Sequence, residues 1–201
     1  MSHAPPDLVS IDVSEGMWER FYRVAPLVVI GTKEDGEIDL APKHMAFPLG
    51  WEGYNGFVCS PRHATYRNIG HTREFTVSYP RPTQVVLASL AAAPREGWES
   101  NKPIVSALPT FPATRVRAPL LADADFFLEC ELERIVDGFG PNSLIAGRVV
   151  AAHARPEALI VSDRDPAEHL ANSPLLAYVD PGRFTAITDS DAFPFPAGFK
   201  K

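Results

Sequence analysis

Short runs of alternating hydrophobic and polar residues, most of them the length of a β-strand, make up much of the chain. The segment 26–42 (PLVVIGTKEDGEIDLAP) contains two apolar runs separated by Asp35-Gly36. An Asp-Gly connection between two strand-like runs is a strong signal for a β-hairpin, because both residues tolerate a positive φ. The pattern therefore predicts an antiparallel pair of strands here.

Further runs of strand length follow the hairpin. They lie at 43–47, 56–59, 74–80, 125–140 and 142–154. In the run EFTVSYP the residues Phe75, Val77 and Tyr79 share one face, as in a strand that is buried on one side. About seven strands joined mostly by hairpins predict a mostly β fold, an antiparallel barrel or sandwich. The 20 prolines are spread between these runs, where they suit turns and sheet edges.

Three segments are predicted to be short helices. Residues 14–24 carry apolar side chains at helical spacing behind Ser14, a favoured N-cap, and residues 82–94 have helical composition. A third helix of about nine residues is framed by Ser60-Pro61 as N-cap and first helical position and by Gly70 as C-cap. The predicted helices are too few and too short for a helical bundle.

Composition narrows the class of protein. The 201 residues fit one domain, and a net charge of −6 with interspersed signs argues against a nucleic-acid binder that neutralises many phosphates. The first residues lack the pattern of a signal peptide, and no apolar stretch approaches the roughly 20 residues of a membrane helix. Cys59 and Cys130 fit no metal-binding spacing. These features predict a cytoplasmic protein that binds neither nucleic acid nor membrane.

The start of the third predicted helix has the chemistry of an anion site. A helix N-terminus leaves backbone N–H groups unpaired and carries partial positive charge. Ser60, Arg62, His63 and Thr65 lie around that end, and Arg62 and Thr65 share a face because they are three residues apart. Phosphate is the natural ligand of such a site. The same residues also suit an ordinary helix start with solvated side chains, so the stretch alone leaves both interpretations open.

A second candidate segment is 39–51 (DLAPKHMAFPLGW). Ala41-Pro42 interrupts the strand, which fits a sheet edge or a bulge, where free backbone groups can meet a planar heterocycle. Lys43, His44 and Met45 follow directly, on a strand that would run beside the third helix in a meander.

Side chains for independent catalysis are not evident in the sequence. The histidines form no HxH or HxxxH pair, the glutamates form no evident carboxylate dyad, and the Gly-x-Ser-x-Gly of serine hydrolases is missing. Neither a metal site nor a catalytic residue is therefore assigned. A phosphate-binding helix without a catalytic acid, base or nucleophile indicates that the chemistry belongs to a bound cofactor.

The order of three segments resembles the flavin reductase-like family, whose fold is the FMN-binding split barrel. The segments are PLVVIGTKEDGEIDLAPKHMAF, GFVCSPRHATYRNI and REFTVSYP. The resemblance covers about residues 24–155 of a single 1–201 domain, leaves 156–201 as a C-terminal extension, and implies a homodimer with one FMN per subunit near the interface. It implies that Lys43, His44, Met45 and Ala46 line the isoalloxazine ring, largely through backbone atoms, and that Ser60, Arg62, His63 and Thr65 hold the phosphate. The apolar tail FPFP, residues 193–196, is expected to dock, with a partner subunit as one candidate surface.

One motif departs from the family pattern. Many family reductases carry Gly-Asp-His with a glycine five residues after the histidine, which is associated with nicotinamide binding. The matching run here is GPNSLIAG, Gly140 to Gly147, so Asn142 stands in place of the histidine. Asparagine can hydrogen-bond but cannot carry a positive charge. Asn142 is therefore the expected substrate-side position, and this change weakens the expectation of NAD(P)H oxidation more than that of flavin binding.

The sequence leads to one main functional hypothesis and two alternatives. The main hypothesis is an oxidoreductase of flavin reductase type that binds FMN or FAD and passes a hydride from NAD(P)H to the flavin. A flavin-dependent oxygenase or another acceptor would then take up the electrons. The alternatives are an FMN-holding electron carrier of flavoredoxin type and a flavin-binding module without catalysis.

Overall fold

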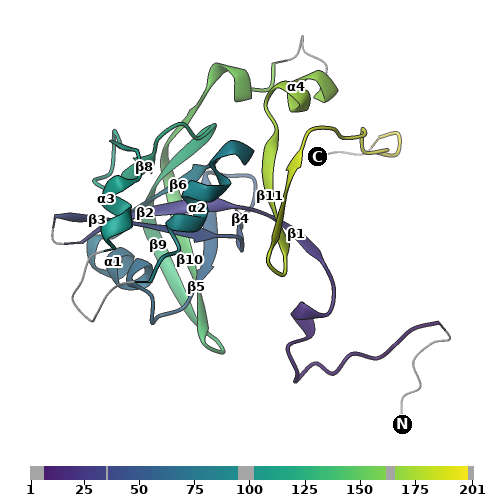
Figure 1. Ribbon diagram of the computed structural model, residues 1–201, viewed down its shortest axis with the longest axis horizontal. Coiled ribbons are helices and arrows are strands. Elements are labelled where there is room, and N and C mark those ends of the chain that lie inside the picture. The colour runs from purple at the N-terminus through teal and green to yellow at the C-terminus, as the bar shows by residue number, and fades with distance from the viewer. Residues whose placement is uncertain (1–6, 35, 95–101, 162–165, 199–201) are drawn as a thin grey trace.

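A curled antiparallel sheet of seven strands forms the body of the protein (Figure 1). The computed structural model describes residues 7–34, 36–94, 102–161 and 166–198. In spatial order the strands are β3 (Glu37–Lys43), β2 (Val28–Glu34), β6 (Glu74–Tyr79), β9 (Phe126–Phe139), β10 (Asn142–Ala154), β5 (Tyr54–Cys59) and β4 (Ala46–Pro48). Among these residues, no helix has both the length and the apolar character needed to span a lipid bilayer.

The two edges of this sheet are consecutive in the chain. Strands β3 and β4 lie at opposite ends of the strand order, yet only His44 and Met45 separate them in sequence. The sheet must therefore curl until its edges approach, without hydrogen bonds between them. This is a β-barrel split along one side, as the sequence predicts.

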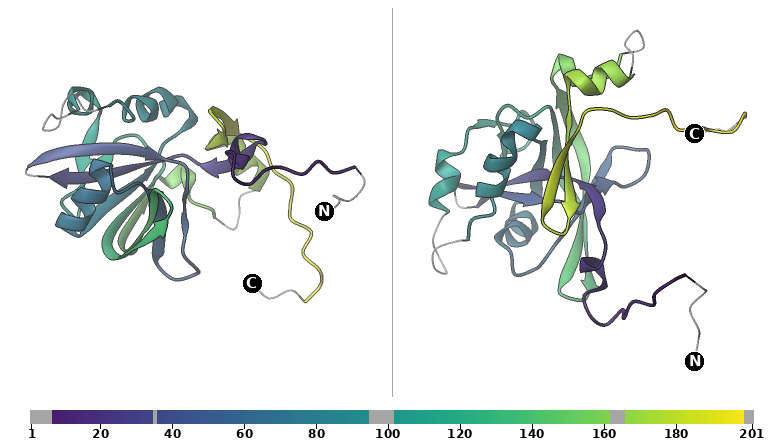
Figure 2. Two further views of the ribbon diagram at one scale, coloured as in Figure 1. Left: turned by 90° about the horizontal axis from the view of Figure 1, so that it is seen from below. Right: turned by 45° about the vertical axis from the view of Figure 1, so that its right-hand side comes forward.

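Helices and smaller sheets surround the barrel. The remaining strands are β1 (Arg23–Pro26), β11 (Leu175–Asp180) and β12 (Arg183–Ile187), which form one sheet, and β7 (Thr110–Pro112) and β8 (Pro119–Leu121), which form another. The helices are α1 (Ala64–Thr72), α2 (Val85–Leu90), α3 (Pro103–Ala107) and α4 (Pro166–Asn172), with 3-10 turns η1 (Met17–Glu19), η2 (Pro82–Gln84) and η3 (Pro156–Ala158). Helices α1, α2 and α3 lie on the side of β2 and β3, and the sheet of β1, β11 and β12 lies on the opposite side, where both terminal segments leave the body (Figures 1 and 2).

Two of the three apolar clusters among the described residues position the layers around the site. The inside of the barrel contains Phe57 and Phe75, both fully buried, in an edge-to-face contact with 5.4 Å between ring centroids. A second cluster packs Leu40 of β3 against Ala88 of α2 and Val105 of α3. This second cluster fixes α2 and α3 on the outer face of β3, and so positions one wall of the site described below.

The hairpins are predicted well from the sequence. Strands β2 and β3 pair in the register Glu34↔Glu37, so the connection falls on residues 35 and 36, of which only Gly36 is described, with φ +90°. Strands β9 and β10 pair over nearly their whole length and are joined at Gly140-Pro141, with Gly140 at φ +62°. The strand predicted at 43–47 is instead divided between the ends of β3 and β4.

The helix predicted at 14–24 is wrong. Only η1 is helical there, and Arg23–Pro26 forms strand β1, which pairs with β11. The apolar spacing that predicted the helix has no body to pack against, since Trp18 and Phe21 are 52% and 43% exposed. Backbone pairing with a strand about 150 residues later therefore overrides the local pattern. Strands β11 and β12 themselves were not predicted.

The boundaries of α1 also differ from the prediction. The helix has nine residues but begins at Ala64, and Gly70 lies inside it; the left-handed position after its end is Arg73, at φ +65°. Ser60 does not cap the helix, because its Oγ accepts the N–H of Arg62 at 3.3 Å and its carbonyl accepts the N–H of His63 at 3.0 Å. Residues 60–63 thus form a turn that leads into the helix.

Candidate functional site: a cationic cavity at the start of α1

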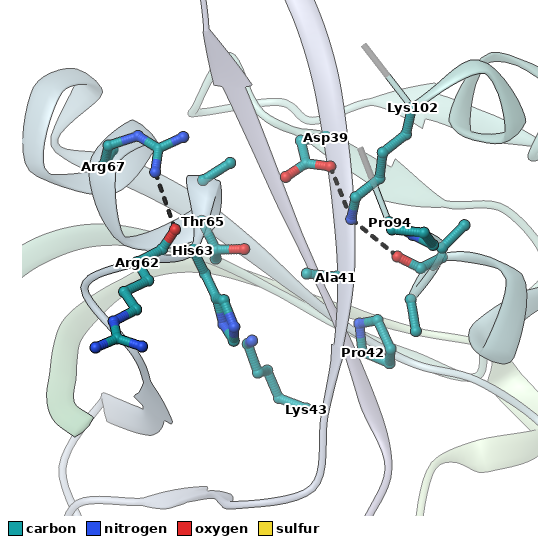
Figure 3. A pocket seen from close by; sticks show the side chains of 14 residues that line it. Asp39, Ala41, Pro42, Lys43, Arg62, His63, Thr65, Arg67, Pro94 and Lys102 are labelled. Atoms are coloured by element: carbon teal, nitrogen blue, oxygen red, sulfur yellow. Dashed lines mark hydrogen bonds and ion pairs between the residues drawn. The ribbon is translucent and has the colours of Figure 1, made fainter. Parts of the chain in front are cut away.

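A cavity of about 410 Å³ lies between the end of strand β3, the start of helix α1, the end of α2 and the residue before α3 (Figure 3). It is lined by small residues, among them Ala41 and Pro42 of β3, and by charged ones. Proline at position 42 has no backbone N–H to donate, which suits the position of β3 at the edge of the sheet. The cavity therefore opens beside an unpaired sheet edge.

The cavity wall is strongly cationic. Among the described residues that line it, four carry a positive charge, Lys43, Arg62, Arg67 and Lys102, and Asp39 is the one acid. Several cations converging on one hollow create a local positive potential even in a protein of net negative charge. The cavity is suited to an anion.

His63 responds to this potential. Burial lowers its pKa from the ordinary value of 6.5, and the charges of Lys43, Lys102 and Arg67 lower it further. The imidazole is therefore neutral at pH 7, and its Nδ1 lies 3.9 Å from the Sγ of buried Cys59. A neutral imidazole among three cations gains affinity for a proton when an anion arrives.

Local hydrogen bonds hold the start of α1 in place. The guanidinium of Arg67 donates to the carbonyl of Arg62 at 3.0 Å, which ties the turn before the helix to the helix itself (Figure 3). Deeper in, the side-chain amide of Asn68 donates to the Oγ1 of Thr32 on β2 at 3.1 Å, and both residues are buried. The helix N-terminus and its partial positive charge are thus fixed against the barrel beside the cavity.

The structure brings together part of the predicted site. Lys43, Arg62, His63 and Thr65 line the cavity, whereas Ser60 lies in the turn that supports it. The other residues of the predicted ring site lie at the β3–β4 corner, outside the cavity wall.

Each residue of that corner has a different environment. His44 packs its ring against Tyr178 of β11, and Met45 is 45% exposed, with its carbonyl accepting the N–H of Val58 at 2.9 Å. Ala46 is 2% exposed and its side chain belongs to the barrel core. The side chain of Ala46 is therefore not available to a ligand, and a role for its backbone stays a prediction.

Asn142 lies close to the same region. Strand β10 pairs with β5 from Ser143↔Cys59 onward, so Asn142 lies one position before this pairing, next to the point where the chain leaves β5 at Ser60. The side chain of Ser143 donates to Asp137 at 2.6 Å, which ties the start of β10 to β9. The register thus places Asn142 beside the turn at residues 60–63, although the two are about 80 residues apart in sequence.

Three charged residues that line the cavity were not assigned to the site from the sequence. Arg67 follows His63 by four residues and so lies one helical turn on, which sequence spacing alone could have indicated. Asp39 is a charged residue within an apolar strand run, a weak signal of a buried pair. Lys102 is 63 residues from Asp39 in the sequence, and no local pattern indicates that the two residues pair.

Comparison with known proteins identifies the class. The family model described as "Flavin reductase like domain" matches residues 22–178, most of the chain. The chain therefore belongs to the flavin reductase-like family, as its sequence motifs predict.

Similar solved structures agree on the fold. Flavoredoxin from Methanosarcina acetivorans superposes with a TM-score of 0.74 at 17% identity, covering 96% of this chain and 97% of that one. An FMN-binding protein from Thermus thermophilus, with bound p-hydroxybenzaldehyde, gives 0.72 at 21% identity, covering 96% and 99%. A protein described as a flavin reductase with a split barrel domain, from Shewanella frigidimarina, gives 0.73 at 15% identity, covering 86% and 87%. At these identities the likeness shows the split-barrel fold.

Proposed function

We propose that this protein is an FMN-binding oxidoreductase of flavin reductase type, which takes a hydride from NAD(P)H onto its flavin. The observation that carries the proposal is the cationic cavity at the start of α1, next to the β3–β4 corner of a flavin reductase-like barrel. A flavin mononucleotide has a phosphate at one end and a planar ring at the other. The cavity offers cations for the phosphate, and the neighbouring β3–β4 corner offers a sheet edge for the ring.

The residues present fit this cofactor. Arg62, Arg67 and Lys43 supply the cations for a phosphate, with the Thr65 side chain and the start of α1 beside them. The corner at His44 to Ala46 supplies a sheet edge for the ring. When bound, the flavin supplies the capacity to accept a hydride and pass electrons on. FAD would use the same contacts, with the adenylate extending beyond the phosphate site.

The chain itself contributes positioning and charge. Arginine binds phosphate through charge-assisted hydrogen bonds, and the hydrogen bond from Arg67 to the Arg62 carbonyl fixes the turn that presents them. His63 adds a titratable group that can take up a proton as the anion binds. Neutral His44, with its pKa lowered by burial and then by Arg23 and Lys43, places an uncharged aromatic ring at the sheet corner.

We further propose that the protein works as a cytoplasmic homodimer and supplies electrons to a flavin-dependent oxygenase or another acceptor. Exposed aromatic residues support an interface. Phe193 and Phe195 in the C-terminal segment are 71% and 48% exposed, and their rings are in tilted contact with 4.6 Å between centroids. Trp51, in the turn after β4, is 93% exposed. Sedimentation velocity at micromolar concentration tests this, because a monomer would contradict it.

An electron carrier that holds FMN but turns over little NAD(P)H is the second candidate. It is favoured by Asn142, which puts an amide beside the phosphate-binding turn where many family reductases have histidine. An amide cannot supply a positive charge to an anionic dinucleotide. A flavin-binding module without catalysis is the remaining alternative.

The visible spectrum of the purified protein before and after anaerobic mixing with NADH or NADPH tests these candidates. Bleaching of the flavin band within seconds supports the reductase, whereas bleaching only by dithionite supports the carrier. The variant Asn142→His serves as an internal comparison: a gain of NAD(P)H-driven bleaching would assign the difference to this position. A colourless protein that takes up no added FMN or FAD contradicts both candidates.

A further inference from the structure

A buried ion pair lies in the wall of the cationic cavity. The ammonium of Lys102 lies 3.2 Å from a carboxylate oxygen of Asp39, and the two side chains are only 12% and 4% exposed. The same ammonium donates to the carbonyls of Leu40 and Ala91, each at 3.1 Å. The ion pair and these two hydrogen bonds together hold the ammonium in one position.

These contacts connect two walls of the cavity. Leu40 and Asp39 belong to β3, and Ala91 follows the last residue of α2, where helix carbonyls carry partial negative charge. Figure 3 shows this pair on one side of the cavity and Arg62 with Arg67 on the other, with Ala41 of β3 between them. Lys102 thus closes the side of the cavity that faces the arginines.

The negative charge of Asp39 disfavours an anionic ligand in this cavity, and Lys102 offsets that charge. A buried carboxylate in the wall of an anion site repels the ligand, and low local dielectric strengthens the repulsion. The ammonium of Lys102 cancels that charge at close range. Its field also reaches the arginine side, because Lys102 is among the cations that lower the pKa of His63, after burial and Lys43. The charge of Asp39 also acts on that side. It contributes to the raised pKa of Cys59, although burial is the main cause of that shift.

We infer that the Asp39–Lys102 pair sets the anion preference of this cavity, with Lys102 acting as a positioning residue that neutralises Asp39 and fixes β3 against the end of α2. In this arrangement Lys102 acts through Asp39 and β3, because one carboxylate and two carbonyls hold its ammonium within the wall. For a flavin ligand the inference rests on the proposed function. For inorganic phosphate it rests on the cavity alone.

Charge variants separate this role from simple stabilisation of the fold. The measured quantity is the phosphate preference, the Kd of riboflavin divided by the Kd of FMN, since the two ligands share a ring and differ in the phosphate. Lys102→Met is expected to lower this preference about tenfold, because the charge of Asp39 then faces the ligand without its ammonium. Asp39→Asn is expected to leave the preference unchanged or raise it. The double variant, with both charges removed, is expected to return to within about threefold of wild type.

The matched control is Arg148→Met. It removes one positive charge from the exposed pair of Arg148 with Glu131, whose side chains are 51% and 54% exposed and lie outside the cavity wall. This variant should keep the wild-type preference. Equal weakening of both ligands by Lys102→Met, or loss of preference in Asp39→Asn, would overturn the inference, because a purely structural role predicts loss in both single variants.

Two further measurements test the inference if Lys102→Met does not fold or if the protein does not bind flavin. If Lys102→Met does not fold, wild type and the double variant are compared, and a lost phosphate preference in the folded double variant overturns the inference. Inorganic phosphate alone is titrated against the His63 imidazole signals in an NMR spectrum. Phosphate affinity that follows the same order of variants, in a protein with no preference for FMN, would sustain the inference and reject the flavin phosphate site. Wild type that binds neither phosphate nor FMN rejects both.

Discussion

The imidazole ring of His44 lies against the phenol ring of Tyr178, with 4.6 Å between the ring centroids and 30° between the ring planes. His44 stands at the split of the barrel, and Tyr178 belongs to the separate sheet of β1, β11 and β12. The stack therefore ties the small sheet to the corner where β3 gives way to β4.

Tyr178→Ala is expected to destabilise the protein by about 2 kcal/mol, through the lost ring contact and its buried area. It is also expected to raise the pKa of His44 toward 6.5, because burial is the main cause of its lowered value. Urea denaturation and the pH titration of the His44 signals in an NMR spectrum measure the two effects. Tyr178→Phe is the control: it keeps the ring and loses the hydroxyl that accepts the Gly182 N–H at 2.9 Å, so the pKa of His44 should stay low.

Arg62→Ala is expected to weaken FMN binding by about 10- to 100-fold, since a charge-assisted hydrogen bond contributes about 1.5–3 kcal/mol. Riboflavin affinity should change little. Arg67→Ala should weaken FMN binding at least as much, because it also removes the hydrogen bond that holds the Arg62 carbonyl. Fluorescence titration of the apoprotein measures these affinities. Arg117→Ala, at an exposed ion pair with Glu74 outside the cavity wall, is the control, and equal affinity in all three variants would reject this assignment.

The sequence predicts two hairpins of the barrel well, because each joins strands that are adjacent in the chain. The hairpins of β2 with β3 and of β9 with β10 need only alternation and a turn, and both are in the chain as contiguous signals. The helix predicted at 14–24 runs into the first residues of strand β1, which was missed because its partner, β11, lies about 150 residues away. A pattern read within a window of 11 residues holds no information about such a partner.

Binding of an anion in the cavity is expected to raise the pKa of His63. The charges of Lys43, Lys102 and Arg67 lower this pKa in the free protein, after burial, and a bound phosphate offsets them. By linkage, protonation of His63 strengthens phosphate binding as the pH falls below the pKa of His63 in the complex. The ligand phosphate itself loses charge near pH 6. The test therefore compares the phosphate affinity of wild type and His63→Gln as a function of pH. The variant should lose more affinity than wild type between pH 8 and 6, and parallel affinity curves would contradict the prediction.

Gly147→Ala is expected to destabilise the barrel by about 1–3 kcal/mol. A Cβ at this position would lie 2.5 Å from Cζ of Phe75, inside the barrel core, and 3.1 Å from the Cβ of Cys130. The last glycine of the run GPNSLIAG is thus required by packing. Gly70→Ala is the opposite case: no heavy atom lies within 4 Å of its Cβ position, and within helix α1 the change should stabilise by about 0.5–1 kcal/mol. Thermal denaturation of both variants checks the contrast in sign.

The candidate site could be predicted only where its residues are close in sequence. Arg62, His63 and Thr65 lie within four residues at the start of α1, so the sequence signals of a helix start were enough to bring them together. The pairing of Asp39 with Lys102 depends on how α2 and α3 pack on β3, which no local pattern specifies. Likewise, the register of β10 with β5 is what brings Asn142 to Ser60.

Glu129 is fully buried in β9 and is expected to be the largest single source of acid sensitivity among the groups whose pKa is shifted. Its carboxylate accepts the backbone N–H groups of Thr114 and Arg115 at 2.9 and 2.5 Å, and it faces Nε2 of His153 at 2.9 Å. Burial raises its pKa, but these hydrogen bonds outweigh burial and lower the pKa from 4.5 to about 2. The carboxylate thus fastens the segment before β8 to the barrel.

The lowered pKa of Glu129 means that the folded state binds its proton less tightly than the unfolded state. The resulting stability, about 3 kcal/mol, is present above pH 4.5 and is lost as the pH falls toward 2. Glu129→Gln should remove that pH dependence, and at pH 7 it should destabilise the protein by about 3 kcal/mol, because the amide cannot accept all of the donors. Urea denaturation at pH 7, 5 and 3 measures both effects. His153→Gln, which changes only the partly exposed partner, should keep most of the pH dependence, since the backbone donors of Thr114 and Arg115 remain.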